Sequence, residues 1–103
     1  MGQFIDSDDK VLLVSEHFGH LTGMLGAYMF QHPMSGELVC CELMWWTEPG
    51  SRGGGVALLR YVERWAREHG ASKMHMIAPN DRVGEFYERV GYDRVETTYQ
   101  RSL

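Results

Sequence analysis

The stretch Arg52-Gly53-Gly54-Gly55-Val56-Ala57 decides the fold, because a strand pattern leads into it and a helix pattern starts inside it. Residues 38–47 form an apolar run typical of a strand, and residues 56–69 have the spacing of an amphipathic helix. The first amides of a helix have no intrahelical acceptor and carry partial positive charge, and glycines let a backbone approach a ligand closely. The stretch therefore predicts an anion site, which we interpret as a turn that binds a pyrophosphate.

The rest of the chain predicts a mixed α/β fold in a single domain, residues 1–103. An antiparallel meander leads into a β-α-β crossover, which requires parallel pairing. A second helix begins at Asn80 or Asp81 and ends at Gly91. The order is β-β-β-α-β-α-β, with strands expected over 10–16, 21–30, 37–47, 72–77 and 92–100.

Composition excludes several classes of function. The net charge of −4 argues against a nucleic-acid partner, since phosphate backbones attract basic surfaces. We find no apolar run long enough to span a membrane and no secretory signal pattern, so we expect a cytoplasmic protein. The five histidines lack paired ligand spacing, and we expect no metal site. Cys40 and Cys41 are adjacent in a strand, point to opposite faces, and are expected to be reduced thiols.

The order of elements and two motifs resemble the GNAT superfamily of acetyl-CoA-dependent N-acetyltransferases. The family carries Q/R-x-x-G-x-G/A at the turn between strand and helix, and its three specified positions are occupied here by Arg52, Gly55 and Ala57. The family also carries an Asn ahead of a helix that ends in F/L-Y-x-x-x-G-F/Y. The matching residues are Asn80, Phe86, Tyr87, Gly91 and Tyr92.

The resemblance implies that acetyl-CoA is the cosubstrate. Its pyrophosphate would bind the amides of residues 53–57, and its pantetheine arm would pair with the backbone near residues 45–47. In such folds this strand and the next one separate and leave backbone groups that the pantetheine amides satisfy. The implied cofactor-binding residues are Trp45, Trp46, Thr47, Arg52, Gly53, Gly54, Gly55, Val56, Ala57, Asn80 and Tyr87.

Acetyl transfer needs a proton donor for the leaving thiol and a means of removing a proton from the amine. By its match to the family motif, Tyr87 is the candidate general acid. Glu42 is the best-placed carboxylate for the base, although strand parity alone leaves a solvent-facing orientation equally open. Glu37 is a weaker alternative, and water serves as the base in many members of the family.

Members of the family usually begin with a strand and two helices that wall the acceptor side of the cleft. By this comparison the chain starts near the end of the second helix, around Phe4 and Ile5. The acceptor site would then be open, completed by a partner subunit, or lost. The leading hypothesis is direct attack, in a ternary complex, by a primary amine of a small molecule or a protein. The alternatives are a non-catalytic CoA-binding or protein-interaction module, and a homodimer that completes the cleft.

Overall fold

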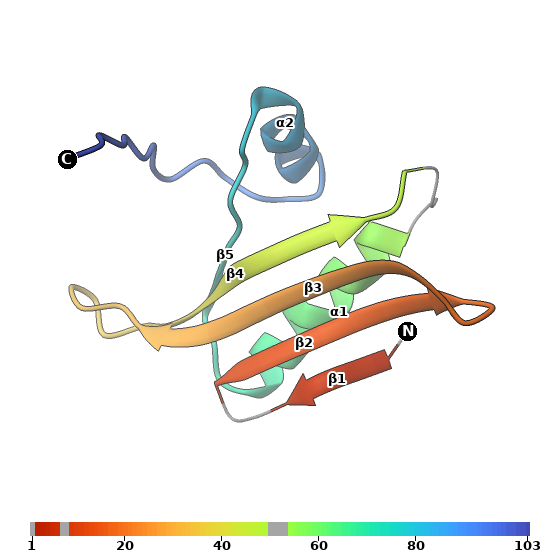
Figure 1. The fold of residues 1–103 in the computed structure, drawn as a ribbon. Coiled ribbons are helices and arrows are strands. Elements are labelled where there is room, and N and C mark those ends of the chain that lie inside the picture. Colours follow the sequence, from red (N-terminus) through yellow and green to blue (C-terminus); the bar gives the residue numbers. More distant parts are fainter. Residues whose placement is uncertain (1, 7–8, 50–53) are drawn as a thin grey trace.

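The computed structural model describes residues 2–6, 9–49 and 54–103, which form one five-stranded sheet and two helices (Figure 1). The strands lie side by side in chain order: β1 (Gly2–Asp6), β2 (Lys10–His17), β3 (His20–Gln31), β4 (Leu38–Thr47) and β5 (Lys73–His75). β1 to β4 pair antiparallel, whereas β5 pairs parallel to β4 after α1 (Gly54–Glu68), and α2 (Asp81–Arg89) follows. The predicted mixed α/β class, with a meander and a β-α-β crossover, is confirmed.

Local chemistry explains where these elements turn and end. The β2–β3 hairpin closes through Phe18 and Gly19, whose φ angles of 51° and 74° give the turn the twist that antiparallel strands favour. Gly70 and Gly91 follow the two helices with φ angles of 92° and 104°, a conformation that favours glycine. Asn80 caps α2, because its side-chain oxygen accepts a hydrogen bond from the Val83 amide at 3.0 Å.

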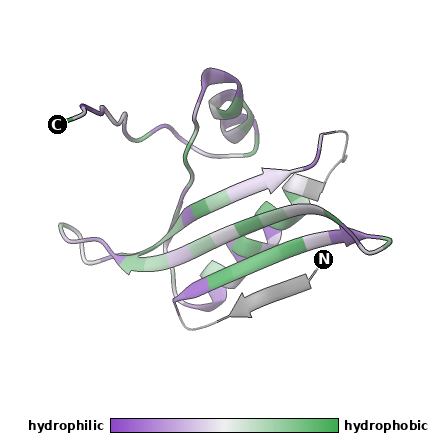
Figure 2. Cartoon of the chain, viewed as in Figure 1, coloured by the Kyte–Doolittle hydropathy of each residue, from purple (hydrophilic) through white to green (hydrophobic). Residues whose placement is uncertain are grey.

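The core lies between α1 and one face of the sheet. The apolar stripe of α1 packs against inward-facing side chains of β2, β3 and β4, and burying each large side chain contributes roughly 1.5–3 kcal/mol. The buried residues of this layer include Leu13, Leu25, Ala27, Cys40, Leu58, Leu59, Val62 and Trp65. In Figure 1, α1 runs behind the sheet, and the face toward the viewer carries no helix of the described chain. Figure 2 shows that hydrophobic residues continue along β2 and β3.

The expectation for the start of the chain was wrong. The region around Phe4 and Ile5 lies in strand β1, not at the end of a helix, because it pairs with the outer edge of β2 from Gly2↔Val14 to Asp6↔Val11. Phenylalanine and isoleucine favour a strand where a free edge can receive them. Residues 7–9 alone connect β1 to β2, which leaves no room for a helix between them.

The expected last strand, residues 92–100, is also absent from the structure. This segment is extended but joins no sheet, and Val95 and Tyr99 are exposed. Its β-branched and aromatic residues favour a strand, yet strand propensity has little effect without a neighbouring strand to complete the hydrogen bonds. In Figure 1 the segment runs away from β5 toward the C-terminus.

Candidate active site at the parting of β4 and β5

β4 and β5 separate halfway along β4. Their parallel pairing runs from Val39↔Lys73 to Cys41↔His75, and beyond that point β4 pairs only with β3 among the described residues. The edge of β4 over residues 42–47 therefore presents backbone groups that no strand satisfies. A backbone group that is shielded from water needs a partner, so this edge is suited to an extended ligand with amide groups. The separation that the family resemblance implies is present in the structure.

A β-bulge at Leu43 decides which side chains face this cleft. Glu42 pairs with Ala27 while Met44 pairs with the adjacent Gly26, so Leu43 is the extra residue. Simple alternation would place position 42 on the same face as position 46. The bulge instead places Glu42 on the face of Trp45, which pairs with Leu25 on the side that α1 covers.

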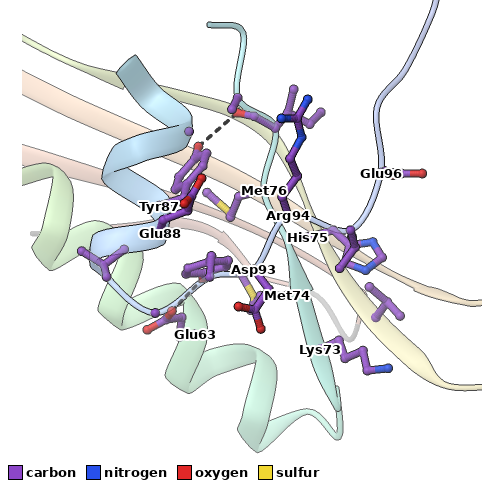
Figure 3. A pocket seen from close by; sticks show the side chains of 18 of the residues that line it. Glu63, Lys73, Met74, His75, Met76, Tyr87, Glu88, Asp93, Arg94 and Glu96 are labelled. Carbon is purple, nitrogen blue, oxygen red and sulfur yellow. Dashed lines mark hydrogen bonds between the residues drawn. The ribbon is translucent and has the colours of Figure 1, made fainter. Parts of the chain in front are cut away.

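Glu42 and Tyr87, the two residues predicted to carry the chemistry, meet at this cleft. The Tyr87 hydroxyl lies 3.3 Å from Glu42 Oε1 and 3.1 Å from the Ile77 carbonyl oxygen, and it can donate to either. Figure 3 shows Tyr87 itself, which projects from α2. Glu42 Oε1 also accepts a hydrogen bond from the Ile77 amide at 3.2 Å. The carboxylate thus replaces a strand-to-strand bond where β4 and β5 part, and the alternative of a solvent-facing Glu42 does not hold.

Sequence reasoning missed Ile77. It lies just beyond β5 and contributes only its backbone amide and carbonyl, for which any residue type would serve. No compositional signal could have identified it.

The surroundings raise the pKa of both groups, which makes Glu42 a stronger base and Tyr87 a weaker acid. Burial raises the pKa of Glu42 above its ordinary value, although the bonds from Ile77 and Tyr87 oppose this effect. Burial, and then the charge of Glu42, raise the pKa of Tyr87, so the phenol stays protonated near neutral pH. A protonated phenol in contact with a carboxylate can give up a proton and receive another.

Trp45 links this pair to the start of α1. Its ring stacks on Tyr87, with centroids 6.0 Å apart and an interplanar angle of 23°. A Cβ built on Gly55 would lie 3.4 Å from Trp45 Cζ2 and 3.0 Å from Thr47 Cγ2, so any larger residue there would have to push these side chains aside by a few tenths of an ångström. The indole Nε1 of Trp45 is buried without a hydrogen-bond partner. An unpaired buried donor costs free energy, and its place beside a helix N-terminus fits a site for an acceptor-rich ligand.

Most of the residues predicted to bind the cofactor lie in the described part of the chain. Arg52 and Gly53 lie outside the described residues, whereas Gly54 to Ala57 form the first turn of α1. Thr47 borders Gly55 at the end of β4. Trp46 points to the opposite face, where it is 44% exposed. The Asn80 oxygen already caps α2, which leaves its amide nitrogen for a ligand.

Glu37, the weaker candidate base, lies away from the cleft at the start of β4. It accepts hydrogen bonds from Ser72 at 2.8 Å and Lys73 at 3.3 Å. These bonds, that from Ser72 most strongly, lower the pKa of Glu37, which makes it a weaker base.

No cluster of three or more metal-ligating side chains occurs within the described ranges. Cys40 and Cys41 are free thiols, and burial raises the pKa of Cys40 to about 12. No helix among the described residues has the length and apolar character needed to cross a membrane.

Comparison with known proteins agrees with the fold. The sequence pattern of the acetyltransferase (GNAT) family matches residues 2–92, nearly the whole chain. The chain therefore belongs to the GNAT acetyltransferase family. A search of curated proteins gave no match.

Solved structures of low sequence identity share the fold. A ribosomal-protein-alanine N-acetyltransferase from Brucella melitensis biovar Abortus 2308 is similar with a TM-score of 0.75 and 20% identity, over 92% of this chain and 72% of that one. An aminoglycoside acetyltransferase from an uncultured soil metagenomic sample is similar with a TM-score of 0.79 and 16% identity, over 95% of this chain and 68% of that one. Glucosamine-6-phosphate N-acetyltransferase from Arabidopsis thaliana is similar with a TM-score of 0.81 and 15% identity, over 92% of this chain and 67% of that one. The chain thus spans about two thirds of the length of these structures.

Proposed function

We propose that this protein transfers an acetyl group from acetyl-CoA to a primary amine. The observation that carries the proposal is the meeting of Tyr87 and Glu42 where β4 and β5 part, beside the first turn of α1. Acetyl-CoA would supply the activated acetyl group as a thioester. The free amides of Gly54 to Ala57 would hold its pyrophosphate, and the unpaired edge of β4 over residues 45–47 would hold its pantetheine arm.

In this proposal Tyr87 and Glu42 divide the proton transfers. As the amine nitrogen bonds to the acetyl carbon and the carbon–sulfur bond breaks, Tyr87 donates its phenolic proton to the departing sulfur. Glu42 accepts the proton that the amine loses, directly or through a water. Because Glu42 Oε1 lies 3.3 Å from the Tyr87 hydroxyl, the same proton can then pass to the phenolate and restore the pair. Protons and electrons balance without a further reactant.

The acceptor is proposed only as a class, an amine-bearing small molecule or protein. Structures with this fold include enzymes named for aminoglycosides, for glucosamine-6-phosphate and for a ribosomal protein, so the fold alone does not select among them. The net charge of −4 favours cationic acceptors. The cytoplasmic location stays a prediction from the sequence.

A second candidate function, a CoA-binding or protein-interaction module without catalysis, is favoured by one observation. Residues 7–9 alone join β1 to β2, where the family usually places the two helices that wall the acceptor side. A thiol-release assay with a panel of primary amines, run beside calorimetry with acetyl-CoA, separates the two candidates. Binding with amine-dependent release supports the enzyme. Binding without release for any amine supports the module.

A further inference from the structure

An apolar patch lies beside the candidate site, on the outer face of the sheet, the face opposite α1. The side chains of Leu43, Met44 and Trp46 are 61%, 41% and 44% exposed, and we call these three residues the β4 patch. A Cβ built on Gly26 would lie 3.3 Å from Met44 Cγ and 3.8 Å from Leu43 Cβ, whereas the neighbours of Gly26 in β3 are buried against α1. Because side chains alternate along a strand, both residues lie on the outer face, and Trp46 lies there too by its pairing with Met24.

The β-bulge brings this patch next to Glu42. Leu43 is the extra residue, so Glu42 lies on the α1 face while the side chains of Leu43 and Met44 lie on the outer face. Ile77 lies across the cleft, where its amide donates to Glu42 at 3.2 Å and its own side chain is 64% exposed. A molecule that reaches Glu42 from the outer face therefore passes beside Leu43 and Ile77. These two residues line the approach whatever else packs on the rest of the face.

The patch has apolar surroundings and a carboxylate at its border. Its cross-strand neighbours on the outer face of β3 and β2 are apolar: Leu12, Val14, Met24 and Gly26. An amine can meet the Glu42 carboxylate at this border. A molecule with many hydroxyls or several charges would cover the patch with polar groups that find no partner there, which costs free energy. The patch therefore suits an acceptor with one amine and an apolar body.

The two proposed substrates would approach the site from opposite faces. The first turn of α1, the proposed pyrophosphate site, packs against Trp45 and Thr47 on the α1 face. The β4 patch lies on the face toward the viewer in Figure 1, which carries no helix of the described chain. Attack on a thioester in a ternary complex needs an amine that arrives from a different direction than the cofactor, and this arrangement allows it.

We propose that the acceptor is an arylalkylamine, a primary amine joined by a short carbon chain to an aromatic ring. The ring would lie on the β4 patch, because indole and thioether groups favour aromatic partners, and the amine would reach Glu42. The patch extends roughly 10 Å along the strand, enough for a ring and a two-carbon chain.

This inference rests on the proposed acetyl transfer and names its acceptor class. The amine nitrogen would bond to the acetyl carbon as the carbon–sulfur bond breaks, which gives the N-acetylated amine and free CoA. Glu42 would accept the proton that the amine loses, and Tyr87 would donate a proton to the departing sulfur, so protons and electrons balance.

Turnover with a panel of primary amines tests the acceptor class. The panel is 2-phenylethylamine, ethanolamine, glucosamine and spermidine, each assayed by thiol release from acetyl-CoA. We expect kcat/KM for 2-phenylethylamine to exceed that for each other amine at least ten-fold, because its ring buries apolar surface that the others lack. A preference for any other amine, or equal rates with all four, would overturn the proposal.

Two variants with matched controls connect this preference to the patch. Trp46→Ser and Leu43→Gln remove apolar surface from the patch, while Phe18→Ser and Met34→Gln make comparable changes at exposed positions in the β2–β3 turn and the β3–β4 connection. We expect each patch variant to lower the preference for 2-phenylethylamine over ethanolamine roughly three- to ten-fold, mainly through KM. The controls should keep the preference of the unchanged chain. Equal losses in patch and control variants would contradict the placement of the ring.

A binding measurement separates this inference from the proposed chemistry. In NMR spectra of the labelled protein with CoA present, 2-phenylethylamine should give saturable shifts in the methyl groups of Leu43 and Met44 and the indole of Trp46, and ethanolamine should not. Shifts without thiol release from any amine would uphold the site and refute acetyl transfer. Absence of these shifts would overturn the inference whether or not amines are acetylated. So would a dimer in analytical ultracentrifugation that Trp46→Ser dissociates, because a second copy of the chain would then cover the patch.

Discussion

Replacing Tyr87 by phenylalanine removes one hydroxyl from the candidate site and little else. The phenyl ring can keep its stacking on Trp45 at 6.0 Å, while the contacts to Ile77 at 3.1 Å and Glu42 at 3.3 Å are lost. A typical hydrogen bond contributes about 0.5–1.5 kcal/mol net, so we expect the free energy of unfolding to fall by that amount. General acid catalysis is worth roughly 10²- to 10⁴-fold, so kcat should fall at least 100-fold.

The assay pairs thiol release with calorimetry of acetyl-CoA binding. Because the cofactor would be held mainly by α1 and β4, we expect its Kd to change less than about two-fold. Tyr92→Phe is the matched control, since its hydroxyl also makes a partly buried bond to a carboxylate, Glu63, at 2.7 Å. It should cost similar stability while leaving kcat unchanged. An unaltered kcat in Tyr87→Phe, or an equal loss in both variants, would refute the role of Tyr87.

Three further predictions concern Glu42, Gly55 and the cysteines. Burial raises the pKa of Glu42, so its ionisation makes the folded state less stable as pH rises through the folded pKa. Above that pH, Glu42→Gln should therefore be more stable than the unchanged chain in urea denaturation. In acid, where Glu42 is protonated, this advantage should disappear. A pH-independent difference between the two would show that the carboxyl does not titrate with a raised pKa. Gly55→Val should lower the free energy of unfolding by about 1–3 kcal/mol, because the larger side chain overpacks against Thr47, and it should weaken acetyl-CoA binding in calorimetry. Unchanged stability would mean that the helix does not need its close approach to β4. Cys40, with a pKa of about 12 and a fully buried side chain, should react with a disulfide reagent far more slowly in the folded protein than after unfolding, and rapid native labelling would contradict its burial.

Much of the fold could be predicted because local signals were strong. The amphipathic stripe of α1, Gly91 at the end of α2 and the capping Asn80 act within a few residues of chain, and each lies where the sequence indicated. Strand membership depends on distant partners instead. The β1 segment pairs with the open edge of β2, whereas residues 92–100 have strand-forming side chains but pair with no strand of the described chain.

The candidate site was predictable in its residue types but not in its geometry. Family motifs pointed to Tyr87, and the scarcity of carboxylates in an apolar strand pointed to Glu42. Which way Glu42 faces depended on the bulge at Leu43, and no residue type marks that irregularity. The unpaired indole of Trp45 depends on the close packing of α1, which appears only in three dimensions.

Binding of acetyl-CoA to the first turn of α1 is the most direct test of the central claim. Amide resonances can be followed in ¹H–¹⁵N correlation spectra as acetyl-CoA is titrated into the labelled protein. The account predicts saturable shifts in the amides of Gly54 to Ala57 and of residues 45–47, along with the indole N–H of Trp45. Saturating acetyl-CoA that leaves all of these resonances in place would contradict it.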